Sequence, residues 1–229
     1  LTYWNTISFH ALYAKASHFD VAQSPALADR PLMDRWIISA LQKLIIDVEE
    51  CYESYEPHRA ARAIQEFVDE HLSNWYVRLG RRRFWKGEMS TDKQAAYETL
   101  YECLTTTAQL MSPVAPFFAD WLFKNLNNKE ESVHLSYWPK SNASIIDETL
   151  NESMQLAQNI SSMILSLRKK VDIRVRQPLQ KVLLPVLDPQ FKTKVEHVKD
   201  LILSETNIKE IEYIDDASGI LVKNIKANF

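Results

Sequence analysis

Hydrophobic residues recur at helical spacing along most of the first 170 positions of the chain. From Met33 to Tyr55 an apolar side chain returns every three or four residues, which is the period of one face of an α-helix. Similar stripes run from Ile64 to Leu79 and from Leu150 to Leu167. On this pattern we predict helices over residues 2–16, 31–54, 57–85, 91–112, 114–126 and 150–170.

Glycine, proline and small polar residues mark the ends of these segments. Gly87 follows the third segment and suits the left-handed conformation that closes a helix. Thr91 and Gln94 have the spacing of a capping box, which predicts that Thr91 caps the start of a helix. Pro113 and Pro116 interrupt the next segment, because proline cannot donate the backbone hydrogen bond of a helix interior. Several helices joined by short connections predict an antiparallel helical bundle.

The hydrophobic pattern changes after Lys170, where runs that alternate with period two or are short and apolar replace the helical stripes. The elements predicted here are strands over residues 173–176, 182–186, 208–214 and 220–225 and a helix over residues 191–203. We therefore expect a mainly α fold, with a helical domain over residues 1–170 and a small α/β unit over residues 171–229.

Composition narrows the possible functions. The chain has 3 glycines in 229 residues, where average usage would give about 16. So few glycines leave no glycine-rich loop to hold phosphates, which argues against nucleotide binding in this chain. Its apolar runs are shorter than the roughly 20 residues that cross a bilayer, and its first 20 residues do not resemble a signal peptide. Because the chain starts at Leu1 and not at methionine, we expect it to be part of a longer polypeptide.

Residues that could carry chemistry are isolated from one another. Cys51 and Cys103 fall on apolar faces of predicted helices, and we expect both to be reduced packing residues in a cytosolic protein. The 6 histidines are scattered and lack the spacing of metal ligands. Adjacent acids such as Glu49 and Glu50 point in different directions on a helix and are predicted to be solvated. We therefore predict neither a catalytic residue nor a metal site in this chain.

Positive charge is concentrated in two places on an otherwise acidic chain. The net charge is −3, from 27 basic and 30 acidic residues. Residues 78–86 hold 5 basic residues and no acid, and residues 168–181 hold 6 basic residues with Asp172 as their single acid. Such local clusters are typical of a nucleic-acid footprint. The alternatives are an ordinary solvated surface or a set of structural ion pairs.

Several stretches carry a family resemblance. The runs WNTISF at residues 4–9, NWYVR at 74–78, RRRFW at 81–85 and PVAPF at 113–117 resemble the helical domain of class I aminoacyl-tRNA synthetases for aliphatic amino acids. The most specific stretch is KKVDIRVRQPL at residues 169–179, which is similar to a segment of the isoleucyl-tRNA synthetase family. The valyl and leucyl families match this stretch less well.

The resemblance implies a segment that binds the anticodon stem-loop of isoleucine tRNA. It implies a cytoplasmic ligase that joins isoleucine to this tRNA with ATP and magnesium, with the catalytic domain of the same polypeptide as a second partner and no membrane. The family's adenylation motifs and editing insertion are absent from this sequence, so we expect the chain itself to be non-catalytic and to hold no cofactor. The alternatives are the equivalent domain of a valyl- or leucyl-tRNA synthetase, or a helical protein-interaction scaffold.

The RNA contacts are predicted in the two basic clusters and on the first helix. Asn5 is a candidate for reading a base edge, with capping or a buried structural role as the alternative, and Trp85 is a candidate for base stacking. Arg174 and Arg176 are expected on one side of a strand, where they bind phosphates or pair with carboxylates. The predicted RNA-binding residues are Asn5, Arg78, Arg81, Arg82, Arg83, Trp85, Lys86, Arg168, Lys169, Lys170, Arg174 and Arg176.

Two further expectations concern packing and stability. Trp75 and Tyr76 fall on an apolar stripe and are predicted to be core residues. Exposed charges contribute only about 0–1 kcal/mol each to stability. We therefore expect replacement of Arg81, Arg82 and Arg83 with alanine to weaken the binding of all tRNAs while the fold survives.

Overall fold

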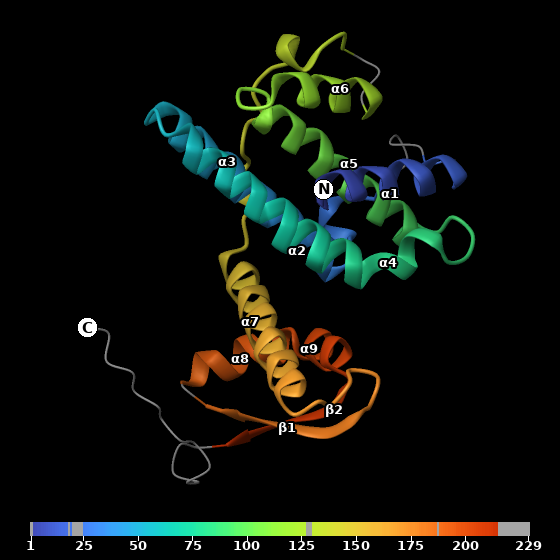
Figure 1. Ribbon diagram of the computed structural model, residues 1–229, viewed down its shortest axis with the longest axis vertical. Helices are drawn as coiled ribbons and strands as arrows, with labels where there is room; N and C mark the ends of the chain where they lie inside the picture. Colours follow the sequence, from blue (N-terminus) through green and yellow to red (C-terminus); the bar gives the residue numbers. More distant parts are fainter. Residues whose placement is uncertain (1, 18, 20–24, 127–129, 187, 215–229) are drawn as a thin grey trace. The chain divides into compact units, whose positions relative to one another are not determined.

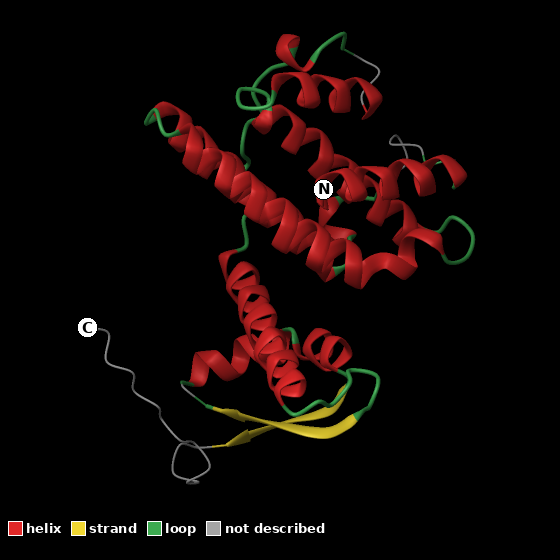
Figure 2. Cartoon of the chain, in the orientation of Figure 1, coloured by secondary structure: helices red, strands yellow, loops and turns green. Residues whose placement is uncertain are grey.

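The computed structural model describes residues 2–17, 19, 25–126, 130–186 and 188–214. The chain forms two compact units, Leu1–Glu148 and Thr149–Phe229. Helices dominate the described residues, and the described strands both belong to the second unit (Figure 2). The expected fold class, a mainly α helical bundle followed by a small α/β unit, is therefore confirmed.

The first unit is a bundle of helices (Figure 1). Their bounds are α1 Thr2–Ala16, α2 Leu32–Glu53, α3 Pro57–Glu66, α4 Arg78–Trp85, α5 Thr91–Met111 and α6 Pro116–Leu126, with a π-type helix, η3 Phe67–Val77, between α3 and α4. Short 3-10 helices lie in the connections at η2 Leu27–Asp29, η4 Val133–Leu135 and η5 Ala143–Ile145. The helices predicted from hydrophobic spacing in this unit are confirmed with small differences at their ends, except that η3 interrupts the helix predicted over residues 57–85.

The core of the first unit includes the packed faces of α2 and α5. Ile37, Leu41 and Val48 return at helical spacing on α2, and each is 0% exposed. Leu100 and Leu104 of α5 are likewise 0% exposed, and the two helices contact each other. Burying one such side chain stabilises a fold by about 1.5–3 kcal/mol, so this apolar spacing is what aligns the bundle.

A continuous helical segment runs from α3 through η3 to α4, where we predicted one uniform α-helix (Figure 1). In η3 the backbone makes the wider i→i+5 turns of a π-helix. Three consecutive residues, Trp75, Tyr76 and Val77, are buried there, because α1 and α2 both pack against η3. The prediction that Trp75 and Tyr76 belong to the core is confirmed.

The turn between α4 and α5 is set by two backbone features. Gly87 follows α4 with a φ of 74°, the left-handed conformation that we expected at this helix end. Helix α5 is capped by Ser90, whose Oγ accepts a hydrogen bond from the Lys93 backbone N–H at 3.2 Å. The predicted cap at Thr91 was therefore wrong by one residue, because Ser90 offers the same hydroxyl one position earlier.

The second unit consists of helices on one face of a two-stranded parallel sheet (Figure 1). Its elements are α7 Glu148–Lys170, β1 Leu179–Pro185, α8 Pro189–His197, α9 Lys199–Thr206 and β2 Ile208–Ile214. The strands pair from Leu179 opposite Ile208 to Pro185 opposite Ile214. Parallel neighbours need a crossover connection, which α8 and α9 supply.

Residues 173–176 form a loop with a turn at residues 175–176, and not the predicted strand. Their carbonyls are used elsewhere: Arg174 O accepts from the Arg168 guanidinium and Val175 O from the Asn207 amide. The helix predicted over residues 191–203 is two helices, which meet at Val198, where the backbone φ is −119°. The strand predicted over residues 220–225 lies outside the described residues.

Helix α7 belongs to the second compact unit, so the units divide at Glu148, whereas we placed the domain boundary after residue 170. A two-stranded sheet has too little surface to form a stable core by itself. The apolar stripe of α7 supplies that surface through buried residues such as Met154 and Ile160. The strands contribute Leu184, Ile208 and Ile211 to the buried set.

Candidate nucleic-acid interface

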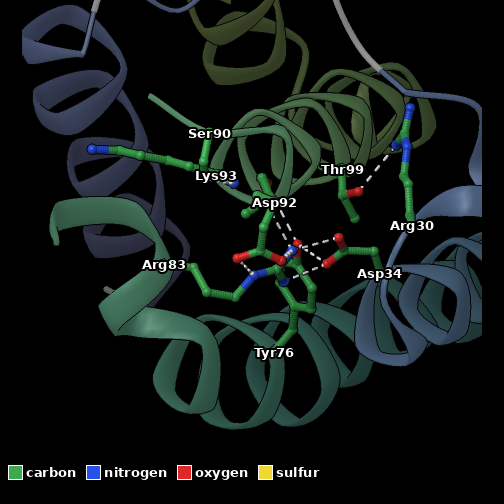
Figure 3. A network of polar contacts seen from close by, with 9 residues as sticks. Arg30, Asp34, Tyr76, Arg83, Ser90, Asp92, Lys93 and Thr99 are labelled. Carbon is green, nitrogen blue, oxygen red and sulfur yellow. Dashed lines mark hydrogen bonds and ion pairs between the residues drawn. The ribbon is translucent and has the colours of Figure 1, made fainter. Parts of the chain in front are cut away.

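Arg83 is held in a buried ion pair with Asp34 (Figure 3). Its Nη1 and Nη2 donate to the two carboxylate oxygens of Asp34, each at 2.7 Å. The Tyr76 hydroxyl donates to the same carboxylate at 2.7 Å, and Arg83 also pairs with Asp92 at 2.9 Å. The Asp34 side chain is 0% exposed and that of Arg83 is 19% exposed. Because bidentate pairs fix geometry as well as adding energy, this network joins α2 to α4 and α5.

The network changes the interpretation of the first basic cluster. Burial, followed by the Asp34 charge, raises the pKa of Tyr76, so its phenol remains a hydrogen-bond donor. The Arg83 guanidinium is already bound in ion pairs with Asp34 and Asp92. Arg83 therefore has a structural role, in contrast to the phosphate contact that we predicted. Its partner Asp34 lies 49 residues earlier on another helix, so local spacing could not identify it.

The remaining residues of this cluster lie on the outside of α4. Arg78, Arg81, Arg82, Trp85 and Lys86 are exposed, and we call them the α4 cluster. The Arg78 Nε donates to the Asn74 carbonyl at 2.7 Å. The Arg81 guanidinium lies 5.7 Å from the centre of the Phe9 ring of α1. Because α4 contains no acidic residue, its outer surface is a positive strip with one indole ring, 52% exposed, at its end.

The second basic cluster also divides into one buried and several exposed residues. Arg168 is 3% exposed, and its guanidinium donates to the carbonyls of Arg174, Gln177 and Asn207 at 3.1, 3.0 and 3.2 Å. It is thus a structural residue of the second unit, and its guanidinium is not exposed for the phosphate contact that we predicted. The exposed residues, which we call the loop cluster, are Lys169, Lys170, Arg174 and Arg176.

Asn5 is exposed on α1. It lies three residues inside a helix that begins at Thr2, so it does not occupy the capping position that we gave as an alternative. Its exposure also contradicts the buried structural alternative. A base contact by the Asn5 amide remains a prediction.

Our sequence interpretation missed the exposed aromatic residues of α6. Phe117 is 91% exposed and Trp121 is 43% exposed. The available signal was the sequence PFFADWLFKNL, which puts 4 aromatic residues into an 11-residue helix. An amphipathic helix of this length buries one stripe, so some of these rings had to remain on the surface.

The described residues offer charge and flat rings for binding. Among them, no group of three or more His, Cys, Asp or Glu side chains could hold a metal ion. Cys51 and Cys103 are buried free thiols. Across the same residues, no helix combines the length and apolar character needed to span a membrane. The exposed cations can neutralise phosphates, and the exposed rings can stack on bases.

Comparisons with known proteins agree on one family. Residues 34–183 match the family described as the anticodon-binding domain of tRNA ligase. Isoleucine–tRNA ligases are similar over 100% of the chain: that of Cytophaga hutchinsonii is 53% identical, that of Porphyromonas gingivalis 51% and that of Thermobifida fusca 41%. The chain spans only 21%, 20% and 22% of the lengths of these relatives. The chain therefore belongs to the family of tRNA-ligase anticodon-binding domains and resembles its isoleucine members over its whole length.

Proposed function

We propose that this chain binds the anticodon stem-loop of isoleucine tRNA, within a cytoplasmic ligase that joins isoleucine to that tRNA. The α4 cluster carries the proposal, because it presents several cations without an acid on a helix fixed by the Arg83–Asp34 pair. Family membership supports tRNA as the ligand class, and the identity of the relatives supports isoleucine. ATP and magnesium act in a separate catalytic domain, while this chain positions the RNA.

Affinity and discrimination come from different residues in this proposal. Arg81 and Arg82 bind phosphate oxygens, which supplies affinity for any tRNA because phosphates carry no sequence information. Asn5 contacts the edge of an unpaired base, where hydrogen bonding depends on the nucleotide, and Trp85 stacks on an unpaired base beside it. The network of Figure 3 contributes indirectly, since it fixes the helix that carries the arginines.

The test is a binding competition with purified tRNAs. The 229-residue chain is titrated with isoleucine tRNA and then challenged with valine and leucine tRNAs over a range of salt concentrations. We expect tighter binding of isoleucine tRNA and a linear fall of log affinity with log salt. A double variant, Arg81→Ala/Arg82→Ala, is expected to weaken all three tRNAs alike.

A charge-matched control is the double variant Arg62→Ala/Lys140→Ala, because both residues are exposed and neither belongs to the α4 cluster. It should bind every tRNA like the unmodified chain. Preference for valine or leucine tRNA would assign the chain to that branch of the family. Failure to bind any tRNA would overturn the proposal and favour the protein-interaction scaffold.

A further inference from the structure

Exposed aromatic rings gather where α1 meets α6. Trp4 of α1 and Trp121 of α6 are stacked, with ring centroids 5.1 Å apart and planes inclined by 20°. Phe118 stacks on Trp121 at 6.0 Å and 21°. Trp4 is 48% exposed and Trp121 is 43% exposed. We call these three residues the aromatic platform, because the Trp4 and Trp121 rings are nearly parallel and both are exposed.

The exposed face of α1 connects this platform to the α4 cluster. Asn5, Ser8 and Leu12 are exposed on it, at spacings that put them on one side of the helix. The 15 residues of α1 include no aspartate or glutamate. At one edge of this face Trp4 contacts the rings of α6. At the other edge Phe9 contacts Phe84 of α4 at 5.2 Å and lies under Arg81.

The charge around this face favours RNA as its occupant. Arg81 and Arg82 are exposed at the α4 edge. The acid of α6, Asp120, pairs with Lys124 at 2.8 Å and accepts a hydrogen bond from Ser132 at 2.6 Å. Trp4 and Phe9 are separated by five residues, or about 7.5 Å along a helix axis. Over this distance, one RNA strand can place a base against Trp4 at the α6 edge and a phosphate beside Arg81 at the α4 edge.

We propose that Trp4 and Trp121, with Phe118 behind them, form a stacking site for unpaired bases of the bound RNA. This inference rests on the proposed function and adds the residues that hold single-stranded bases. Stacking on aromatic rings tolerates any base, because every base has a π-face. The aromatic platform therefore contributes affinity for a single-stranded loop, while the α4 cluster contributes affinity for both loop and stem.

The experiment compares two RNA probes on the 229-residue chain. One probe is a stem-loop with the anticodon loop of isoleucine tRNA, and the other is the same stem as a blunt duplex. We expect Trp4→Leu and Trp121→Leu each to weaken stem-loop binding by about tenfold, which is the loss of one base stack. Duplex binding should not change. Stem-loop binding should also quench indole fluorescence, and the double variant should lose part of that quenching.

Two controls separate stacking from unfolding. Trp4→Phe keeps a flat ring, so it should bind the stem-loop more tightly than Trp4→Leu does, at equal thermal stability. Tyr55→Leu makes the same aromatic-to-aliphatic change at a side chain that is 93% exposed on the α2–α3 turn, and it should bind both probes normally.

The outcomes distinguish this inference from the function on which it rests. If the leucine variants bind and quench like the unmodified chain while Arg81→Ala/Arg82→Ala loses affinity, the aromatic platform is not a base site and the proposed function stands. An unmodified chain that binds neither probe would overturn both. Weaker binding of stem-loop and duplex by the same factor would also overturn the stacking site, because a duplex has no unpaired base to lose.

Discussion

Neighbouring arginines on α4 have different surroundings and therefore different roles. Arg81 lies over the Phe9 ring, Arg82 is exposed, and Arg83 forms a bidentate pair with the fully buried Asp34. A charge in solvent contributes little to stability, whereas a buried charge without its partner is strongly unfavourable. Simultaneous replacement of all three with alanine would mix these effects, so we expect the Arg83 change, in contrast to the other two, to destabilise the fold.

Replacing Asp34 with alanine should lower the free energy of unfolding by about 3–5 kcal/mol, because it leaves the Arg83 guanidinium and the Tyr76 hydroxyl without their shared acceptor. Urea denaturation followed by circular dichroism measures this difference. Arg82→Ala is the matched surface control and should change stability by no more than about 1 kcal/mol. Equal midpoints for the two variants would mean that the network adds no net stability.

His10 should make the stability of the first unit depend on pH. The side chain is 4% exposed, and burial lowers the pKa of His10 to about 4. In the unfolded chain this pKa is about 6.5, so between pH 6.5 and pH 4 the unfolded state binds the proton more readily. Stability should therefore fall by up to about 3 kcal/mol as the pH is lowered through that range.

The measurement is urea denaturation at several pH values, with a histidine-to-glutamine change at a buried and at an exposed position. His10→Gln should flatten the pH dependence between pH 6.5 and pH 4. His134→Gln, at an exposed residue, should leave it unchanged. If the stability of the His10→Gln variant falls with pH as steeply as that of the unmodified chain, groups other than His10 cause the pH dependence.

At the scale of elements, the sequence predicted the helices and strands whose bounds depend on local hydrophobic periodicity. Helix α1 and strand β2 have the predicted bounds, Thr2–Ala16 and Ile208–Ile214, because their patterns match one period without interruption. The features that the pattern did not reveal depend on distant partners. The π-type helix η3 is packed by two other helices, and residues 173–176 form a loop whose carbonyls accept hydrogen bonds from Arg168 and Asn207. Local sequence spacing cannot reveal those interactions, because the partners come from other parts of the chain.

Arg168 should stabilise the loop that follows α7. Its guanidinium satisfies three part-buried backbone carbonyls, and a fully buried acceptor without its donor costs about 1–3 kcal/mol, which is an upper range for each of these. Replacing Arg168 with alanine should therefore lower the stability of the second unit by about 2–4 kcal/mol. It should also speed tryptic cleavage after Arg174 and Arg176. The neighbouring variant Lys169→Ala, at an exposed side chain, should leave the cleavage rate unchanged, and equal rates for both variants would contradict this role.

At the scale of the whole molecule, the sequence predicted where positive charge collects but not which residues face solvent. Both basic clusters lie where the sequence runs indicated. In each cluster one arginine packs inside the protein: Arg83 in the first and Arg168 in the second. The reason is physical: a guanidinium has enough donors to bind either a phosphate or several groups of its own protein, and sequence spacing does not distinguish these uses. The aromatic platform joins residues more than 100 positions apart, at Trp4 and Trp121, so it became visible only in the fold.

The last prediction concerns the contribution of the second unit to RNA binding. Its loop cluster consists of Lys169, Lys170, Arg174 and Arg176, all exposed. If they bind phosphates, replacing all four with alanine should flatten the log–log salt dependence of tRNA binding by roughly one unit for each phosphate that is no longer neutralised. Because Arg168 is retained, its hydrogen bonds to the loop backbone should keep the fold intact. The combined variant with Arg81→Ala/Arg82→Ala should flatten the slope by the sum of the two separate changes, since the clusters are distinct sets of charges. An unchanged slope in the quadruple variant, with normal thermal melting, would show that the loop cluster is solvated and that RNA binding belongs to the first unit alone.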